Sequence, residues 1–264
     1  MPALELIAGH TIAPGTTLTN ITVNTGNSLT VRNAPIDTKI QMICSWALNQ
    51  VPGTIQIRSP RLHDNVNGIQ FNVTSADPDV LWPLNIPQNL ISQDKINVLQ
   101  SGSANAGDIE MSCLLIYYPE LPGIAGRFIN AEELKTRTKN IMTATNSITT
   151  NNTGDYSGEM AINSTQDNFK ANTDYALIGY QTDFNCNCIR WRGADVGNIG
   201  VGGPGNGNDK ALTRDWFLKL SLKYDLPLIP VFNSANKNSI LIDAQVDENS
   251  ANPTVNSIFS ELEA

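Results

Sequence analysis

One glycine pattern stands out among the residues of this 264-residue chain that could do chemistry. Gly200, Gly202 and Gly205 match G-x-G-x-x-G, the fingerprint that holds a dinucleotide pyrophosphate where a strand turns into a helix. Pro204 precedes the third glycine and Asn-Gly-Asn follows it, so no helix is expected to begin there. We therefore predict that residues 200–208 form an exposed, mobile loop, and we expect no bound cofactor.

Other candidate catalytic or metal-binding side chains are scattered along the chain. His10 and His63 lie far apart in sequence and neither has a nearby cysteine, which argues against a zinc or copper site. The sequence contains no G-x-S-x-G turn to expose a serine nucleophile. We expect no catalytic, cofactor-binding or metal-binding residues and no enzymatic activity. The remaining candidates are carboxylates in loops that could meet in space: Asp77, Asp79, Asp195, Asp209 and Asp215.

The cysteines and the charge exclude further classes of function. Cys44, Cys113, Cys186 and Cys188 do not make a disulfide framework, and two cysteines one residue apart on a strand lack bridge geometry, so four free thiols are expected. The net charge is −8 with no run of Lys or Arg, which argues against direct nucleic-acid binding. Because no apolar run reaches about 18 residues and the first residues lack the basic start of a signal peptide, we expect a protein that is not exported.

Short β-strands are the elements predicted to position these residues. Asn, Thr, Ser, Gly and Pro are frequent and charged residues make up only 16% of the chain, which is typical of strands joined by tight turns. In the first half, strands are expected at 17–23, 28–31, 39–46, 53–57, 69–73, 96–99 and 109–117. In the second half, they are expected at 158–162, 175–180, 187–191, 217–222, 228–232 and 239–246.

The chain also matches itself when it is shifted by about half its length, so a duplication of a whole small domain is indicated. We expect Trp82 and Trp216 at equivalent places as core or interface fillers, and Arg58 and Arg192 at equivalent strand ends with a structural role. The shift places Ile43 on Ile178, Ile57-Arg58 on Trp191-Arg192, Trp82 and Leu84 on Trp216 and Leu218, and Val98 and Ser101 on Val231 and Ser234.

The duplication predicts four consecutive segments. We expect a first β-sandwich over residues 1–120, a linker over 121–155, a second β-sandwich over 156–248 and a polar tail over 249–264. The linker holds the one good helix start in the sequence, with Asn130 as the cap and a carboxylate, Glu133, three residues later.

The paired segments, together with residues 175–180 running into 189–193, give the chain a resemblance to a known family. It resembles the double jelly-roll major capsid proteins of tailless icosahedral viruses and membrane-containing phages, over about residues 11–246. The resemblance implies an all-β fold of two tandem jelly rolls and a structural virion protein whose pseudo-hexagonal homotrimers tile an icosahedral capsid. The implied partners are further copies of the chain, minor capsid or vertex proteins and a membrane beneath the shell. The implied location is the virion, after synthesis in the host cytoplasm.

Subunit contacts are expected from the barrel flanks, the linker and the tail. Deletion from Asn249 onward should then weaken assembly more than folding. Two other functions stay open: a tandem-sandwich module that binds a receptor or carbohydrate, favoured by exposed aromatic residues at loop tips, and a double jelly-roll hydrolase, favoured by carboxylates clustered between the barrels. The interface candidates are six apolar residues outside the predicted barrels: Leu121, Ile124, Phe128, Ile129, Ile258 and Phe259.

Overall fold

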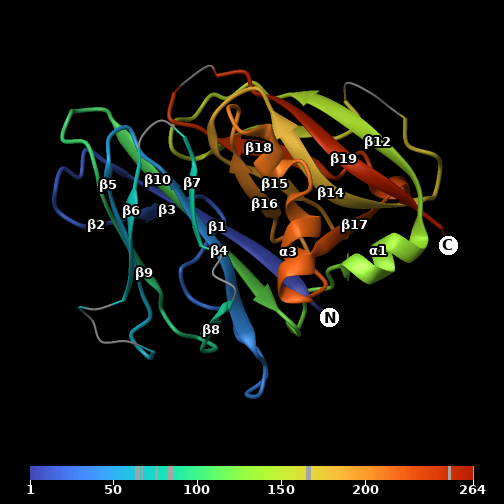
Figure 1. The fold of residues 1–264 in the computed structure, drawn as a ribbon, viewed down its shortest axis with the longest axis horizontal. Coiled ribbons are helices and arrows are strands. Elements are labelled where there is room, and N and C mark those ends of the chain that lie inside the picture. Colours follow the sequence, from blue (N-terminus) through green and yellow to red (C-terminus); the bar gives the residue numbers. More distant parts are fainter. Residues whose placement is uncertain are drawn as a thin grey trace.

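The computed structural model of the chain contains two β-sandwiches that lie side by side (Figure 1). It describes residues 1–62, 66, 68–74, 77–82, 86–164, 168–248 and 251–263, without the side chains of Leu81 and Trp82. Strands at 3–118 form the first sandwich and strands at 128–262 form the second.

The first sandwich has two sheets. Its strands are β1 (Ala3–Ile12), β2 (Thr19–Asn20), β3 (Thr22–Val23), β4 (Ile40–Leu48), β5 (Gly53–Arg58), β6 (Ile69–Val73), β7 (Asp79–Trp82), β8 (Gln88–Leu90), β9 (Asn97–Ser101) and β10 (Ile109–Tyr118). One sheet, called here the β1 sheet, has the order β3-β1-β10-β4-β7, and β8 also pairs with β4. The other, the β5 sheet, has the order β2-β9-β5-β6.

The second sandwich repeats this plan and adds the helices. Its strands are β11 (Phe128–Ile129), β12 (Thr138–Ser147), β13 (Tyr156–Ala161), β14 (Asp174–Thr182), β15 (Cys186–Arg192), β16 (Val201–Gly205), β17 (Ile229–Asn233), β18 (Leu241–Gln245) and β19 (Thr254–Leu262). The helices are α1 (Ala131–Arg137), α2 (Lys210–Thr213), α3 (Trp216–Tyr224) and the 3₁₀ turn η1 (Ser234–Asn236). The β14 sheet has the order β11-β17-β14-β19-β12, and the β15 sheet has the order β13-β18-β15-β16.

Both sandwiches have the connectivity of a jelly roll. In the first, β2 and β3 act as one bent strand, and β7 and β8 both pair with β4 as one interrupted strand. Counted in chain order, the first, eighth, third and sixth strands then form one sheet, and the second, seventh, fourth and fifth form the other. The second sandwich gives the same order from β12 to β19. The predicted fold class, two tandem jelly rolls in an all-β chain, is confirmed.

The four sheets follow one another in the order β5, β1, β15, β14 (Figure 1). Strands β1, β4 and β10 contact β15 and β16, so the outer face of the β1 sheet is covered by the second sandwich. Leu4 and Leu6 of β1 belong to the core of the second sandwich, whereas Ala3 and Ile7 belong to the core of the first. Burial on both faces explains why β4 and β10 are continuously buried and largely apolar, without an alternation of buried and exposed residues.

A β-bulge recurs at the same place in the two sandwiches. The pairing of β4 with β10 skips Ile43, and the pairing of β14 with β19 skips Ile178. The sequence match of Ile43 with Ile178 is therefore correct. The match of Arg58 with Arg192 is also confirmed, because these residues end β5 and β15, the fourth strands of their sandwiches.

The later sequence matches are wrong. Trp82 ends strand β7, but Trp216 opens helix α3, where a strand was expected. The buried residues of α3 are Trp216, Phe217, Leu220 and Ser221, a spacing typical of a helix face, and Asp225 ends the helix in the left-handed conformation (φ 53°). Val98 lies on β9, which corresponds to β18, so its structural counterpart is Ile242 and not Val231.

The predicted linker and tail also differ from the structure. Asn130 caps α1 as expected, with its Oδ1 accepting the Glu133 N–H at 2.8 Å. Strand β12, however, occupies 138–147 of the predicted linker, and β19 occupies 254–262 of the predicted tail. Because β19 pairs on both sides, with β12 and β14, it is a central strand of the second sandwich and no peripheral tail. Strand β1 was also missed, and residues 28–31 supply only one bridge, from Thr30 to Lys95.

Candidate functional site

The junction between the sandwiches brings together side chains from the two halves of the chain. Trp46 of β4 projects into it and donates from its indole N–H to the carbonyl of Asn187 at 2.5 Å. The backbone N–H of Leu6 donates to the carbonyl of Gly200 at 3.1 Å, and the side chain of Leu6 lies against Gly202. Apolar packing and backbone hydrogen bonds thus fix one sandwich against the other.

Strand β16 is the part of this junction that the sequence analysis placed wrongly. Residues 201–205 are fully buried, where an exposed mobile loop was expected. Their glycines are needed for close approach: a Cβ on Gly203 would collide with the Tyr180 hydroxyl and the Trp216 indole. Pro204 is tolerated because β16 is an edge strand, and its carbonyl accepts the Tyr180 hydroxyl at 2.8 Å.

A buried polar group lies in the middle of the junction. Gln245 of β18 donates from Nε2 to the carbonyls of Gly154 at 2.8 Å and Gly9 at 3.3 Å. Its Oε1 accepts from the Asn187 side chain. A buried amide side chain costs free energy unless its polar atoms have hydrogen-bond partners. These hydrogen bonds therefore favour one relative position of the two sandwiches.

Arginines near the end of β15 form a second polar cluster, within the second sandwich. Arg190 donates to both oxygens of the buried Asp243, at 2.9 and 2.6 Å, and its guanidinium lies 3.4 Å from the centre of the Tyr156 ring. Arg192 pairs with Glu159 and lies 3.6 Å from Asp243. These ion pairs give Arg192 the structural role expected from its repeat position.

The same arginines line a cleft of about 510 Å³ between the sandwiches. Arg32 of the first sandwich also lines it and bonds the buried Glu5 at 2.7 and 2.9 Å. Each of Arg32, Arg190 and Arg192 is thus matched by a carboxylate. Among the described residues that line the cleft, every arginine therefore has a carboxylate partner.

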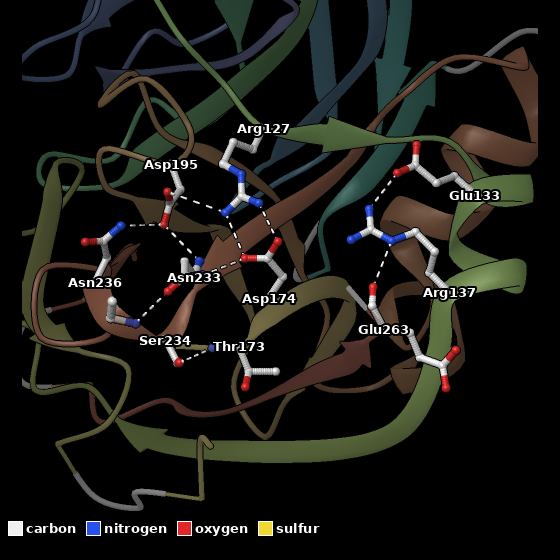
Figure 2. Close-up of polar contacts among 11 residues, drawn as sticks. Arg127, Glu133, Arg137, Thr173, Asp174, Asp195, Asn233, Ser234, Asn236 and Glu263 are labelled. Atoms are coloured by element: carbon white, nitrogen blue, oxygen red, sulfur yellow. Dashed lines mark hydrogen bonds and ion pairs between the residues drawn. The ribbon is translucent and has the colours of Figure 1, made fainter. Parts of the chain in front are cut away.

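Arg127, between the two sandwiches in sequence, anchors that connecting segment to the end of the second sandwich (Figure 2). Its guanidinium bonds both carboxylate oxygens of Asp174, one at 2.9 Å, and lies 4.0 Å from Asp195. Its backbone N–H donates to the Asp195 carbonyl at 2.7 Å, and its carbonyl accepts the Val231 N–H at 2.9 Å. The guanidinium lowers the pKa of Asp174 through these hydrogen bonds.

Amide side chains complete this cluster (Figure 2). Asn233 donates from its side chain to Asp174 at 2.7 Å and from its backbone to Asp195 at 3.0 Å. Asn236 donates to Asp195 at 3.1 Å. The acids are therefore held by a cation and amide donors and are structural in this arrangement.

The interface candidates fall into two groups. Leu121, Ile129 and Phe259 are buried within the chain, so the expectation that they lie outside the barrels is wrong for them. Leu121 joins the core of the first sandwich, and Ile129 and Phe259 join the core of the second. The other three candidates, Ile124, Phe128 and Ile258, are partly exposed, but Phe128 lies on β11 and Ile258 on β19, so the expectation is wrong for these two as well.

In the described part of the chain, the cysteine, histidine and carboxylate side chains that could act in catalysis or metal binding either have a bonding partner or lie apart from one another. All four cysteines are free and buried, as expected. No group of three or more His, Cys, Asp or Glu able to hold a metal occurs among the residues described. His63, Asp64 and Leu84 lie outside those residues. Asp77 and Asp79 accept hydrogen bonds from nearby donors, Asp195 joins the Arg127 cluster, and Asp209 and Asp215 are helix caps.

The described residues contain no helix of the length and apolarity that crossing a membrane requires.

Comparison with known proteins gives no family assignment. No family model matches the chain, and no curated protein matches it. Three solved structures match almost its whole length: the PBSX exported protein XepA (9% identity, 99% of this chain and 86% of that one, TM-score 0.29), the STIV major capsid protein (10%, 99% and 87%, 0.20) and the major capsid protein P2 from bacteriophage PM2 (6%, 100% and 98%, 0.23). At these TM-scores the fold assignment rests on the strand order of the chain itself.

Proposed function

We propose that this chain is the major capsid protein of an icosahedral virus or phage and that it works as a homotrimer with a pseudo-hexagonal outline. The observation that carries the proposal is the repeated jelly roll, with the β1 sheet of the first sandwich stacked on the β15 sheet of the second. Three such chains supply six similar barrels around a three-fold axis, and a closed ring satisfies every repeated contact at once.

The proposal also assigns partners and a location. The chain is a virion component that contacts further trimers and minor capsid or vertex proteins. Because its net charge is −8, the chain does not bind the phosphates of the genome directly, and a membrane, a basic minor protein or counterions lie between them. The two sandwiches, joined by residues 119–127, are its two domains, and the chain has a structural role without catalysis.

The carbohydrate-binding alternative would be favoured by exposed aromatic side chains. In the described part of the chain, the large apolar side chains that are exposed are aliphatic: Met1, Ile12, Ile36, Leu62, Val66, Ile86, Ile141 and Leu222. These residues suit contact with protein better than stacking against sugar rings.

Native mass spectrometry and negative-stain microscopy of the purified chain test the proposal. We expect a trimer, closed shells, or both. A monomer or dimer at assembly concentrations would overturn the proposal, and specific affinity of a monomer for a glycan would favour the binding-module alternative.

A further inference from the structure

The contact inside the chain leaves two unlike surfaces at opposite ends of the molecule: the β5 sheet, and the part of the β14 sheet where β12 keeps exposed residues, since α2 and α3 already pack against β14. The internal junction uses the outer face of the β1 sheet and the outer face of the β15 sheet. Their counterparts are the outer face of the β14 sheet and the outer face of the β5 sheet. Strands β12 and β19 lie at one end of the long axis and β5 and β6 at the other (Figure 1).

We propose that β12 and β19 of one chain pack on β5 and β6 of a second copy, repeating the internal junction between chains. The inference rests on the proposed capsid function and specifies its subunit contact. A head-to-tail contact of this kind joins unlike faces, so it either closes into a ring or continues as a filament.

Strand register identifies which positions correspond. Next to the shared bulge, Leu115 of β10 corresponds to Ile258 of β19. Leu115 pairs with Leu6, and Ile258 pairs with Thr143, so Leu6 corresponds to Thr143. Two residues earlier on each strand, Leu4 corresponds to Ile141 in the same way.

Apolar residues recur at two of these three positions, although their surroundings differ. Leu4 and Leu115 are fully buried at the internal junction. Ile141, the counterpart of Leu4, is 60% exposed, and Ile258, the counterpart of Leu115, is partly exposed. In the first sandwich, the second sandwich covers the apolar side chains at these positions. Their apolar counterparts in the second sandwich are explained if a second copy of the chain covers them.

The opposite face offers a matching surface. Arg190 of β15 pairs with Gly202, and Gln56 of β5 pairs with Gln70, so Gly202 corresponds to Gln70. Inside the chain, the large Leu6 meets the small Gly202. Between chains, the smaller Thr143 would meet the larger Gln70, and both are exposed. The contact between chains would therefore again combine a larger side chain with a smaller one, with the two exchanged between the faces.

The edge of β12 is suited to a contact as well. Its ten residues form a long outer strand, and its only charged residue is Lys139. The corresponding strand β1 is bordered by β3. A long strand edge of this kind is usually covered or blocked in a protein that stays monomeric.

Disulfide trapping tests the contact. In the variant carrying Thr143→Cys and Gln70→Cys, diamide would take two electrons and two protons from facing thiols of neighbouring chains, forming one disulfide and the corresponding hydrazine. We expect a covalent ring of three chains on a denaturing, non-reducing gel, and no cross-link in either single variant. The native cysteines are buried and should not interfere.

Each other outcome has a defined meaning. Native trimers of the unmodified chain whose double variant is folded but not cross-linked would overturn this contact while leaving the proposed function in place. Covalent dimers of Thr143→Cys alone would show β12 pairing with itself and would also overturn it. If the unmodified chain is monomeric, the proposed function fails as well.

A charge substitution gives a second route if the double variant does not fold. Thr143→Arg should convert trimers to monomers, measured by light scattering. Ala106→Arg adds the same charge in an exposed loop between β9 and β10, outside the strands of both faces, and should leave trimers intact. Trimers that persist in Thr143→Arg would contradict the proposed contact.

Discussion

Trp46 and Trp216 meet edge to face across the junction, with ring centroids 6.0 Å apart and planes at 87°. Trp46 comes from the first sandwich and Trp216 from the start of α3. Their indole N–H groups bond carbonyls of the β15-sheet side of the junction, at Asn187 and Gly202. One aromatic pair therefore ties helix α3, the β15 sheet and the first sandwich together.

Replacing Trp46 and replacing Trp216 should have coupled effects on the free energy of unfolding. We expect Trp46→Ala and Trp216→Ala each to lower the free energy of unfolding by about 3–5 kcal/mol. Because the rings also interact with each other, the double variant should lose about 0.5–1.5 kcal/mol less than the sum. Urea unfolding of the four proteins measures this coupling. Strict additivity would show that the ring contact contributes nothing beyond burial.

The early strands could be aligned from the sequence and the later ones could not, for a physical reason. From the bulged third strand to the end of the fourth, the two sandwiches differ in length by only one residue, so Ile43 and Arg58 can be aligned with Ile178 and Arg192. After β16, the second sandwich inserts α2 and α3 before β17. Trp216 lies in that insertion, so its match to Trp82 was a coincidence of spacing.

The errors about the site have a different origin. The glycines of β16 predicted a flexible loop because glycine weakens a strand. The sequence alone does not indicate that the rings of Tyr180 and Trp216 pack against these glycines. Strand β12 was missed because its exposed positions alternate with Ala144 and Asn146, which give almost no apolar signal. Long-range packing decides both cases.

Strand β16 should not tolerate an insertion. A short epitope placed after Gly203 should abolish soluble expression, since it would break the pairing with β15 and the contacts to Tyr180 and Trp216. The same epitope placed after Ala106, in an exposed loop, should be accepted. Comparing soluble yield and thermal melting of the two insertions tests this. Equal yields would mean that β16 contributes little to folding.

The Arg127–Asp174 pair should make the second sandwich sensitive to acid. Since the pKa of Asp174 is lowered in the folded protein, the pair stabilises the fold above the unfolded pKa, about 3.9, and this contribution is lost as pH falls through the lower folded value. Arg127→Ala should cost about 1 kcal/mol at pH 7, because the guanidinium is partly exposed and screened.

Below about pH 4, that difference from the unmodified protein should shrink. Lys135→Ala is the matched control: its side chain pairs with the exposed Glu132, and it should change the free energy of unfolding by no more than about 0.5 kcal/mol. Chemical denaturation at several pH values gives these differences. A cost for Arg127→Ala that stays constant down to pH 2 would contradict the role of Asp174.

The four thiols should be unreactive until the chain unfolds. Burial raises the pKa of the Cys44, Cys113 and Cys186 thiols, so little thiolate is present at pH 8. Titration with a thiol reagent should find no fast-reacting group in the native protein and four in denaturant. Fewer than four in denaturant would indicate a disulfide.

Ile258 and Phe259 are neighbours on β19 and should separate assembly from folding. Phe259 is fully buried, with its ring 5.5 Å from that of Phe169 and 6.4 Å from that of Phe232, so Phe259→Ala should cost about 3–5 kcal/mol. Ile258 lies on the outer face, and Ile258→Ala should cost the isolated chain less than about 1.5 kcal/mol.

If the outer face of β19 contacts a second copy, Ile258→Ala should nevertheless raise the concentration at which trimers form. Sedimentation of both variants, with unfolding measured in parallel, distinguishes the two effects. Because β19 is a central strand, deletion from Asn249 should prevent the second sandwich from folding, contrary to the selective loss of assembly expected from the sequence. Trimers of Ile258→Ala as tight as those of the unmodified chain would place the subunit contact elsewhere.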